Sequence, residues 1–220
     1  MLQNKKIRQK ALESLDGNWG DSSVMTFVYL TIASILSVGG SVLCINAGLT
    51  YTIGGQPADP SGFAMRLLLL PMNFAMMVAF LGLVRGVAVR TGNLFKYYTT
   101  GKVWALGFLT ALYLILWMLL FLIPGIIKYY SYSMTPYILK DNPEISAEQA
   151  ICESMKMMKG YKMKLFLLDL SFIGWAILAL LTLGLGVILL EPYMLTARAV
   201  FYEELKAERG MVDNKYEEVI

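Results

Sequence analysis

Residues 104–132 read WALGFLTALYLILWMLLFLIPGIIKYYSY, a long apolar run that is interrupted by Pro124 and Gly125. From Val103 to Ile123 the chain carries no charged residue, and a membrane-spanning helix needs about 20 predominantly apolar residues. Proline is tolerated in the first turn of a helix but not in its interior, so the Pro-Gly pair predicts a tight turn between two helices. This stretch therefore predicts a helical hairpin inside a membrane.

The composition of the whole chain agrees with a membrane protein. Of its 220 residues 57% are hydrophobic and 16% are charged, and the mean hydropathy is +0.57. Soluble domains contain about 45–50% apolar and about 25% charged residues, and a soluble fold of this length could not bury the surplus. The same values exclude a disordered chain, a disulfide-stabilised secreted domain and a nucleic-acid-binding module, which needs many more positive charges.

Six apolar segments are candidate spans, although two of them are doubtful by hydropathy alone. The fourth segment is short and polar, and the sixth carries Glu191 and Arg198. The segments are Ser23–Ile45, Phe63–Val84, Val103–Ile123, Gly125–Leu139, Lys164–Leu183 and Gly186–Tyr202.

The positive charges favour six spans over four. Lys and Arg accumulate on the cytoplasmic side of short loops. With six spans and a cytoplasmic N-terminus, all of the 19 Lys and Arg residues except Arg66 and Lys128 fall on the inner side, whereas four spans would place the Lys156–Lys164 cluster outside. Because helices satisfy their own backbone hydrogen bonds in lipid, we expect an all-α polytopic bundle of six transmembrane helices. They would form three hairpins, with both termini in the cytoplasm.

Two further segments have the pattern of amphipathic helices at the cytoplasmic interface. Asn4–Leu15 places Ile7, Ala11, Leu12 and Leu15 on one face, and Ser146–Lys159 begins with an N-cap serine and carries Ile151, Met155 and Met158 on one face. We therefore divide the chain into a cytoplasmic N-terminal helix (1–22), a six-helix membrane domain (23–202) with an interfacial helix at about 144–160, and a cytoplasmic C-terminal tail (203–220).

A faint internal repeat links these two segments. Each carries a Glu-Ser pair, then a glycine (Gly17 or Gly160), then an aromatic residue and a membrane span. Repeats underlie many transporter folds, but duplication of a scaffold leaves the same pattern, and the sequence does not decide between them.

Polar and ionisable side chains inside the predicted spans are the candidate functional residues, because they are costly in lipid. They are Arg66, Asn73, Lys128, Ser131, Thr135, Asp169, Glu191 and Arg198. Helical spacing aligns several of them on spans two, four and six, which favours a polar cavity between the hairpins. The alternative is that these residues join helices together, with Arg66 and Lys128 reaching the outer surface. Lys128 and Glu191 lie at similar outer depth, so we expect them to pair, with Arg66 as the competing cation. Asp169 lies at the inner side, near the depth expected of Arg198 and Arg85.

Enzymatic and metal chemistry are not expected. The chain has no histidine, and Cys44 and Cys152 form neither a CxxC pair nor a metal cluster. Asp169 lacks a second intramembrane aspartate for a catalytic dyad. We therefore predict no catalytic, cofactor-binding or metal-ligating residue and expect that the protein is not an enzyme.

Several motifs together resemble one known family. They are Ile123–Met134, Ile145-Ser146, Glu153-Ser154 with Lys159-Gly160, the Trp175…Gly184-Leu185-Gly186…Pro192-Tyr193 run, and the opening Ile7-Arg8…Ala11-Leu12…Gly17-Asn18-Trp19. In combination they are similar to domain of unknown function 975, a family of integral membrane proteins found mostly in Gram-positive bacteria. The resemblance implies a bacterial plasma membrane and carries over no catalytic residue.

Two functions follow as hypotheses. The first is a non-enzymatic helical bundle that binds membrane lipid, a peptide or another membrane protein, with no role in nucleic-acid binding. The second is a small transporter or channel subunit whose polar path is lined by spans two, four and six. Since the chain has no Walker motif, active transport would need an ion gradient or a partner ATPase.

Overall fold

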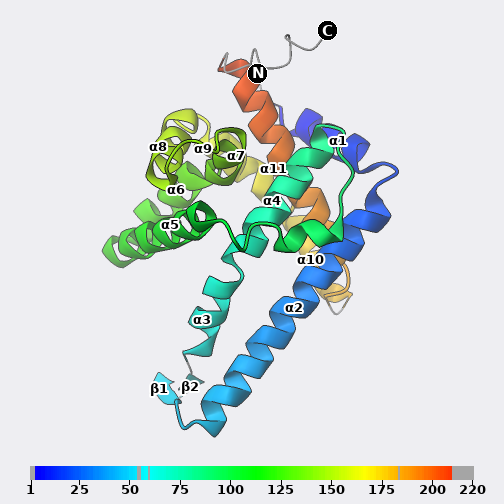
Figure 1. Ribbon diagram of the computed structural model, residues 1–220. Coiled ribbons are helices and arrows are strands. Elements are labelled where there is room, and N and C mark those ends of the chain that lie inside the picture. Colours follow the sequence, from blue (N-terminus) through cyan, green and yellow to red (C-terminus); the bar gives the residue numbers. More distant parts are fainter. Residues whose placement is uncertain (1–2, 54–55, 59, 183, 210–220) are drawn as a thin grey trace.

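The computed structural model describes residues 3–53, 56–58, 60–182 and 184–209, which are mostly helical (Figure 1). The elements are α1 (Asn4–Leu15), α2 (Trp19–Asn46), β1 (Tyr51–Ile53), β2 (Gln56–Ala58), α3 (Ser61–Leu68), α4 (Leu70–Val84), the 3₁₀ helix η1 (Thr91–Phe95), α5 (Gly101–Leu120), α6 (Leu122–Tyr132), α7 (Thr135–Asp141), α8 (Ala147–Met157), α9 (Lys162–Leu170), α10 (Ile173–Leu181) and α11 (Val187–Glu208).

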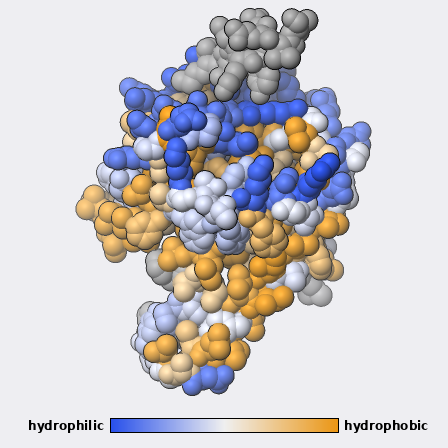
Figure 2. All heavy atoms as spheres, viewed as in Figure 1, coloured by the Kyte–Doolittle hydropathy of each residue, from blue (hydrophilic) through white to orange (hydrophobic). Residues whose placement is uncertain are grey.

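Three helical stretches are long and apolar enough to cross a membrane. They are α2, α5 and the Lys162–Leu181 stretch that contains α9 and α10. Their apolar side chains are largely exposed, since Leu43 on α2 is 69% exposed and Leu119 on α5 is 78% exposed. In Figure 2 hydrophilic side chains gather towards the upper end of the molecule, and hydrophobic ones predominate below them. Large exposed apolar surfaces indicate a membrane environment, and the three stretches match the first, third and fifth predicted spans.

The second and fourth predicted spans are each divided into two helices. The second becomes α3, which ends at Leu68, and α4, which carries Pro71 in its first turn. The fourth becomes α6 and α7, and α7 carries Pro136 in its first turn. A proline clashes with the carbonyl of the preceding turn and lacks an N–H, so a new helix begins at each of these positions. The chain does not form six uninterrupted spans, and α4 is a shorter apolar helix.

The helix α11 contributes to the protein core and continues beyond its predicted end. It runs from Val187 to Glu208, past the domain boundary expected at residue 202. Phe201 and Leu205 are fully buried, and α11 packs against α1 and α4. The C-terminal part of this helix therefore covers other helices, so the first residues of the predicted tail continue α11.

The helices α5 and α6 form the tight hairpin that the Pro-Gly pair predicts, with the turn slightly earlier. α5 ends at Leu120, Phe121 is extended, and α6 begins at Leu122, so Pro124 lies in the first turn of α6. A Cβ atom at Gly125 would lie 2.7 Å from Cγ of Met118. A glycine is thus needed for the close approach of the two helices.

The N-terminal amphipathic helix forms with the predicted bounds, but its apolar face contacts protein. α1 packs against α4, α9 and α11. Its buried side chains are Ile7, Ala11 and Leu15, whereas Leu12 is 44% exposed. The apolar face of α1 therefore completes the protein core.

The second amphipathic helix, α8, is buried in the same way. Its predicted N-cap is present: the Ser146 hydroxyl accepts from the Gln149 backbone N–H at 3.2 Å, and the Gln149 side chain accepts from the Ser146 N–H at 2.8 Å. Ile151 and Met158 are buried, and α8 packs against α5, α6 and α7. The apolar face of α8 therefore contacts protein, with Met155 only partly buried.

The faint repeat has a structural counterpart. Gly17 follows α1 with a φ of +75°, and Gly160 follows α8 with a φ of +85°. Each glycine is in the left-handed region, which a residue with a side chain rarely adopts, and each precedes a long apolar stretch. The turn between α10 and α11 is built similarly, with Gly184 at a φ of +86°.

The loop after α2, which the topology prediction places outside, contains a small antiparallel hairpin that the sequence did not predict. β1 pairs with β2, and Thr52 lies opposite Pro57. In Figure 1 this hairpin lies at the foot of α2 and α3, at the opposite end of the molecule from α1 and the C-terminal end of α11.

Candidate functional site

Arg198 and Asp169 form a bidentate ion pair between α11 and α9. Arg198 Nη2 donates to Asp169 Oδ2 at 2.9 Å, and Nε donates to Oδ1 at 3.2 Å. The two side chains are only 18% and 15% exposed, and Arg198 Nη1 also donates to the Tyr129 hydroxyl of α6 at 3.4 Å. Asp169 and Arg198 were expected at similar inner depth, and here they meet. Each neutralises the other, which is the low-cost way to place charge among apolar helices.

Asn73 joins α4 to α2. Its Oδ1 atom accepts from the Tyr29 hydroxyl at 2.9 Å, and its Nδ2 atom donates to the Leu69 carbonyl at 3.0 Å. Glu191 is partly buried on α11, two helical turns before Arg198, and Arg198 is the cation whose charge acts on it.

Ser131 and Thr135 use their hydroxyls on the backbone. Ser131 donates to the Ile127 carbonyl at 2.8 Å, and Thr135 donates to the Tyr132 carbonyl at 2.7 Å. Ser131 also accepts, through its carbonyl, a 2.8 Å hydrogen bond from the Ser154 hydroxyl of α8. The Ser131 and Thr135 hydroxyls are therefore used within the preceding turn, and of these three contacts the Ser154 hydrogen bond is the one that joins two helices.

Lys128 does not pair with Glu191. Its Nζ atom lies 4.6 Å from the ring centroid of Trp117 and 3.7 Å from the sulfur of Met155, and no ion pair joins it to Glu191 within the described residues. The expected pair is wrong because Lys128 faces α5 and α8, whereas Glu191 lies on α11. A cation–π contact takes the place of the carboxylate. Arg66, the expected competing cation, is exposed on α3.

A cavity of about 280 Å³ brings three of the predicted residues together. We call it the α4–α5 cavity. Asn73, Thr135 and Arg198 lie in its wall, and the other lining residues are Leu70, Phe74, Met77, Val103, Leu106, Gly107, Thr110, Ala111, Leu114, Tyr129, Tyr132, Ser133 and Pro136. Spans two, four and six do meet here, but α5 supplies much of the wall and most of the lining is apolar.

A cluster of charges at the ends of α4, α7 and α11 was not among the sequence candidates. We call Arg85, Asp141, Glu203 and Lys206 the helix-end cluster. Arg85 Nη1 and Nη2 donate to the two oxygens of Asp141 at 2.7 and 2.8 Å, and Arg85 Nε donates to Glu203 at 2.8 Å. Lys206 Nζ donates to Asp141 at 3.1 Å. Opposite charges just past the inner ends of three predicted spans were the sequence signal for this cluster.

Asp141 is the centre of the helix-end cluster. Its side chain is 6% exposed, and burial by itself raises the pKa of a carboxyl. Hydrogen bonds and charge from Arg85, with further hydrogen bonds from Lys206 and Tyr202, outweigh burial and hold the pKa of Asp141 below its usual value. Asp141 is thus a carboxylate that is ionised well below neutral pH.

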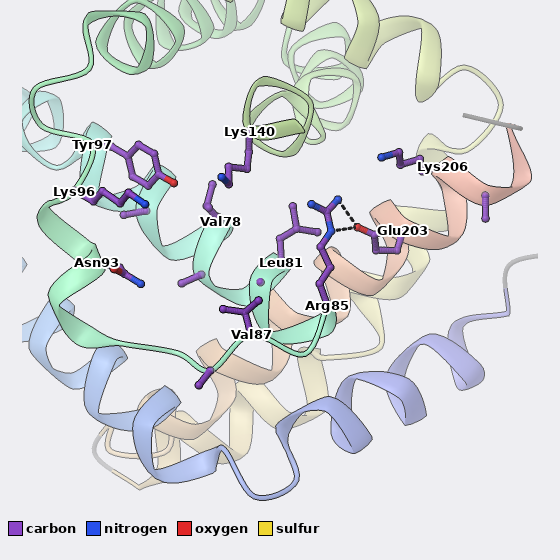
Figure 3. Close-up of a pocket in the computed structure, with 15 residues that line it drawn as sticks. Val78, Leu81, Arg85, Val87, Asn93, Lys96, Tyr97, Lys140, Glu203 and Lys206 are labelled. Carbon is purple, nitrogen blue, oxygen red and sulfur yellow. Dashed lines mark hydrogen bonds and ion pairs between the residues drawn. The ribbon is translucent and has the colours of Figure 1, made fainter. Parts of the chain in front are cut away.

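A larger cavity, of about 780 Å³, opens beside this cluster (Figure 3). We call it the basic cavity. Its floor is apolar and comes mainly from α4, and its wall carries four cations and one carboxylate, namely Arg85, Lys96, Lys140, Lys206 and Glu203. Phe74 of the α4–α5 cavity and Tyr97 of the basic cavity meet edge to face, with ring centroids 4.9 Å apart, so this ring pair lies between the two cavities.

These features indicate a helical membrane protein. It has long apolar helices, a buried ion pair and two cavities, the α4–α5 cavity and the basic cavity, that are large enough for a ligand. The chain belongs to the family described as protein of unknown function (DUF975), whose model matches residues 67–209. The matched region contains α4 to α11 and therefore both cavities. No curated protein and no solved structure matched the chain.

Proposed function

We propose that this protein is a non-enzymatic, multi-pass protein of a bacterial plasma membrane that binds the apolar chain of a lipid in the α4–α5 cavity. The observation that carries the proposal is the lining of this cavity. Its walls are mostly aliphatic and aromatic, and the ionic group in the wall, Arg198, is already paired with Asp169. An apolar pocket with a few placed polar groups is the usual form of a small-molecule site.

The same observation favours a lipid over a peptide. A peptide backbone brings donors and acceptors that need partners in a dry site, and the polar side chains Ser133 and Thr135 of this wall already donate to backbone carbonyls. An acyl chain makes no such demand. The flanking helix α5 is long enough to span and largely exposed, so a membrane lipid has direct access from its neighbours.

For the topology we propose six membrane-embedded segments with both termini in the cytoplasm. Supporting contacts join α2 to α3, α5 to α6 and α10 to α11, which are the partners in the three expected hairpins. The segments that begin new helices at Pro71 and Pro136 would enter the membrane as broken helices, which protein packing tolerates.

The test introduces a large side chain into the α4–α5 cavity from helix α5. Ala111 lines the cavity, and Ala105 lies on the same helix but is exposed. In nanodiscs that contain a phospholipid with a photoreactive group at the end of one acyl chain, we expect crosslinks to Ala111 and its neighbours. Ala111→Phe should remove these crosslinks, and the matched variant Ala105→Phe should keep them. Labelling that is confined to exposed residues in the native protein would contradict the proposal.

Transport is the second candidate, and the Arg198–Asp169 pair favours it. Ionisable residues buried in membrane helices line many ion paths, and this pair connects α9, α11 and, through Tyr129, α6. Liposomes that contain the protein should then show an ion-dependent flux that Asp169→Asn abolishes at equal protein level. A flux that is the same with and without protein would reject this candidate.

A further inference from the structure

We propose that the basic cavity binds the phosphate headgroup of an anionic membrane lipid. This inference concerns the polar end of the molecule and does not require that the α4–α5 cavity be occupied. It rests on two lysines without a carboxylate partner, on an apolar floor beneath them, and on the position of the cavity.

The charged side chains of the cavity wall differ in whether they have an ion-pair partner. Arg85 is held by Asp141 and Glu203, and Lys206 is held by Asp141. Lys96 and Lys140 are exposed, and neither forms an ion pair or a hydrogen bond within the described residues. Lys96 has only a long contact, 6.0 Å, with the ring of Tyr97.

Figure 3 shows Lys96 and Lys140 on facing sides of the cavity, with Tyr97 and Asn93 on the side of Lys96. The carboxylate in the wall, Glu203, accepts from Arg85 and lies on the far side of that arginine. An anion between the two lysines would therefore meet two free ammonium groups and would be separated from the carboxylate by a guanidinium. Such an arrangement suits a phosphate, which lysine binds as a point charge.

The apolar floor of the cavity favours a lipid over a free phosphate ion as the ligand. Ala79, Gly82, Val87 and Ala88 form the accessible apolar strip of the lining, and Val87 is 62% exposed, whereas Ala75, Val78 and Leu81 are already buried by protein. A hydrated inorganic ion gains nothing from such a strip, whereas the glycerol and first methylenes of a lipid bury against it. The helix α4 also runs from the hydrophilic end of the molecule towards the hydrophobic part (Figures 1 and 2). A lipid that lies along α4 would thus place its polar headgroup and its apolar chains in matching surroundings.

The test uses the full chain in detergent, titrated with phosphatidylglycerol or phosphatidylcholine and analysed by native mass spectrometry. We expect preferential binding of phosphatidylglycerol. The double variant Lys96→Gln/Lys140→Gln should bind it about 30-fold more weakly, since each basic residue near an anionic lipid contributes a factor of about five. The control Lys5→Gln/Lys6→Gln removes the same charge from exposed positions of α1 and should change binding less than about twofold.

Two further arms make the outcome decisive. Lys96→Arg/Lys140→Arg keeps both charges and should retain binding, which separates a headgroup site from a loss of folding. Inorganic phosphate should compete only at concentrations far above those of the lipid. The proposal is overturned if both double glutamine variants lose the same affinity, if neither loses any, or if inorganic phosphate alone binds as tightly as phosphatidylglycerol with the same lysine dependence.

Discussion

At the scale of single residues, the pair of Arg198 and Asp169 shows how this bundle holds charge among apolar helices. Each member is mostly shielded from solvent, and the bidentate geometry satisfies both carboxylate oxygens. Removing one partner of such a pair strands the other, which costs far more than the pair contributes. Lys128 has no carboxylate partner among these contacts, because its ammonium group contacts the Trp117 ring and the Met155 sulfur instead.

Asp169→Asn should therefore destabilise the protein by about 3–5 kcal/mol, the range for breaking a buried ion pair. Thermal unfolding in detergent measures the loss. Adding Arg198→Gln removes the stranded charge, so the double variant should recover much of the stability. A double variant whose loss equals the sum of the two single losses would show that the two residues are not coupled.

At the scale of elements, the helix-end cluster ties α4, α7 and α11 together through one carboxylate. Asp141 accepts from Arg85, Lys206 and Tyr202, with the Tyr202 hydroxyl at 2.9 Å from Oδ2. The ordinary pKa of an aspartate is about 4, and here it is lowered. A lowered pKa means that the ionised form is favoured in the folded state, so the stabilisation is present above about pH 4 and is lost as the pH falls through the folded value.

The corresponding prediction is a pH profile. The melting temperature of the native protein should fall below about pH 4, and Asp141→Asn should show a lower melting temperature at pH 7 with a shallower fall in acid. Asp21→Asn, on the first turn of α2, is the matched control. Parallel acid profiles for the native protein and Asp141→Asn would refute the assignment.

The α5–α6 hairpin gives a second prediction at this scale. In Gly125→Ala the new Cβ atom would lie 2.7 Å from Cγ and 3.2 Å from Cα of Met118, so backbone as well as side chain must move. We expect a loss of about 1–3 kcal/mol, the usual cost of overpacking. Adding Met118→Ala should restore part of it. Gly101→Ala meets no atom within 4 Å and should change stability little.

At the scale of the whole molecule, hydropathy and helix caps predicted where most helices lie in the sequence. They did not predict which helices pack against one another. The apolar face of α1 has the same pattern whether it covers lipid or α11, so the sequence predicted the bounds of this helix but not the helices against which it packs. Depth along the spans placed Asp169 near the level of Arg198, and the two side chains pair, although their pairing was not predicted. Depth says nothing about rotation about the helix axis, and for that reason Lys128 and Glu191 were paired wrongly.

The overall polarity of the molecule leads to the last prediction. The charged residues of α1 and the helix-end cluster lie at one end, and the β1–β2 hairpin lies at the other. In a protein whose native Cys44 and Cys152 are replaced by serine, a membrane-impermeant thiol reagent should label a cysteine at Gln56 in intact cells. It should miss a cysteine at Lys159, because basic residues such as Lys156, Lys159 and Lys162 favour the cytoplasmic side. Both sites should react once the membrane is permeabilised, which controls for burial. External labelling at Lys159 with protection at Gln56 would invert the topology, and the basic cavity would then lie away from the cytoplasmic leaflet, where anionic lipids attract basic segments.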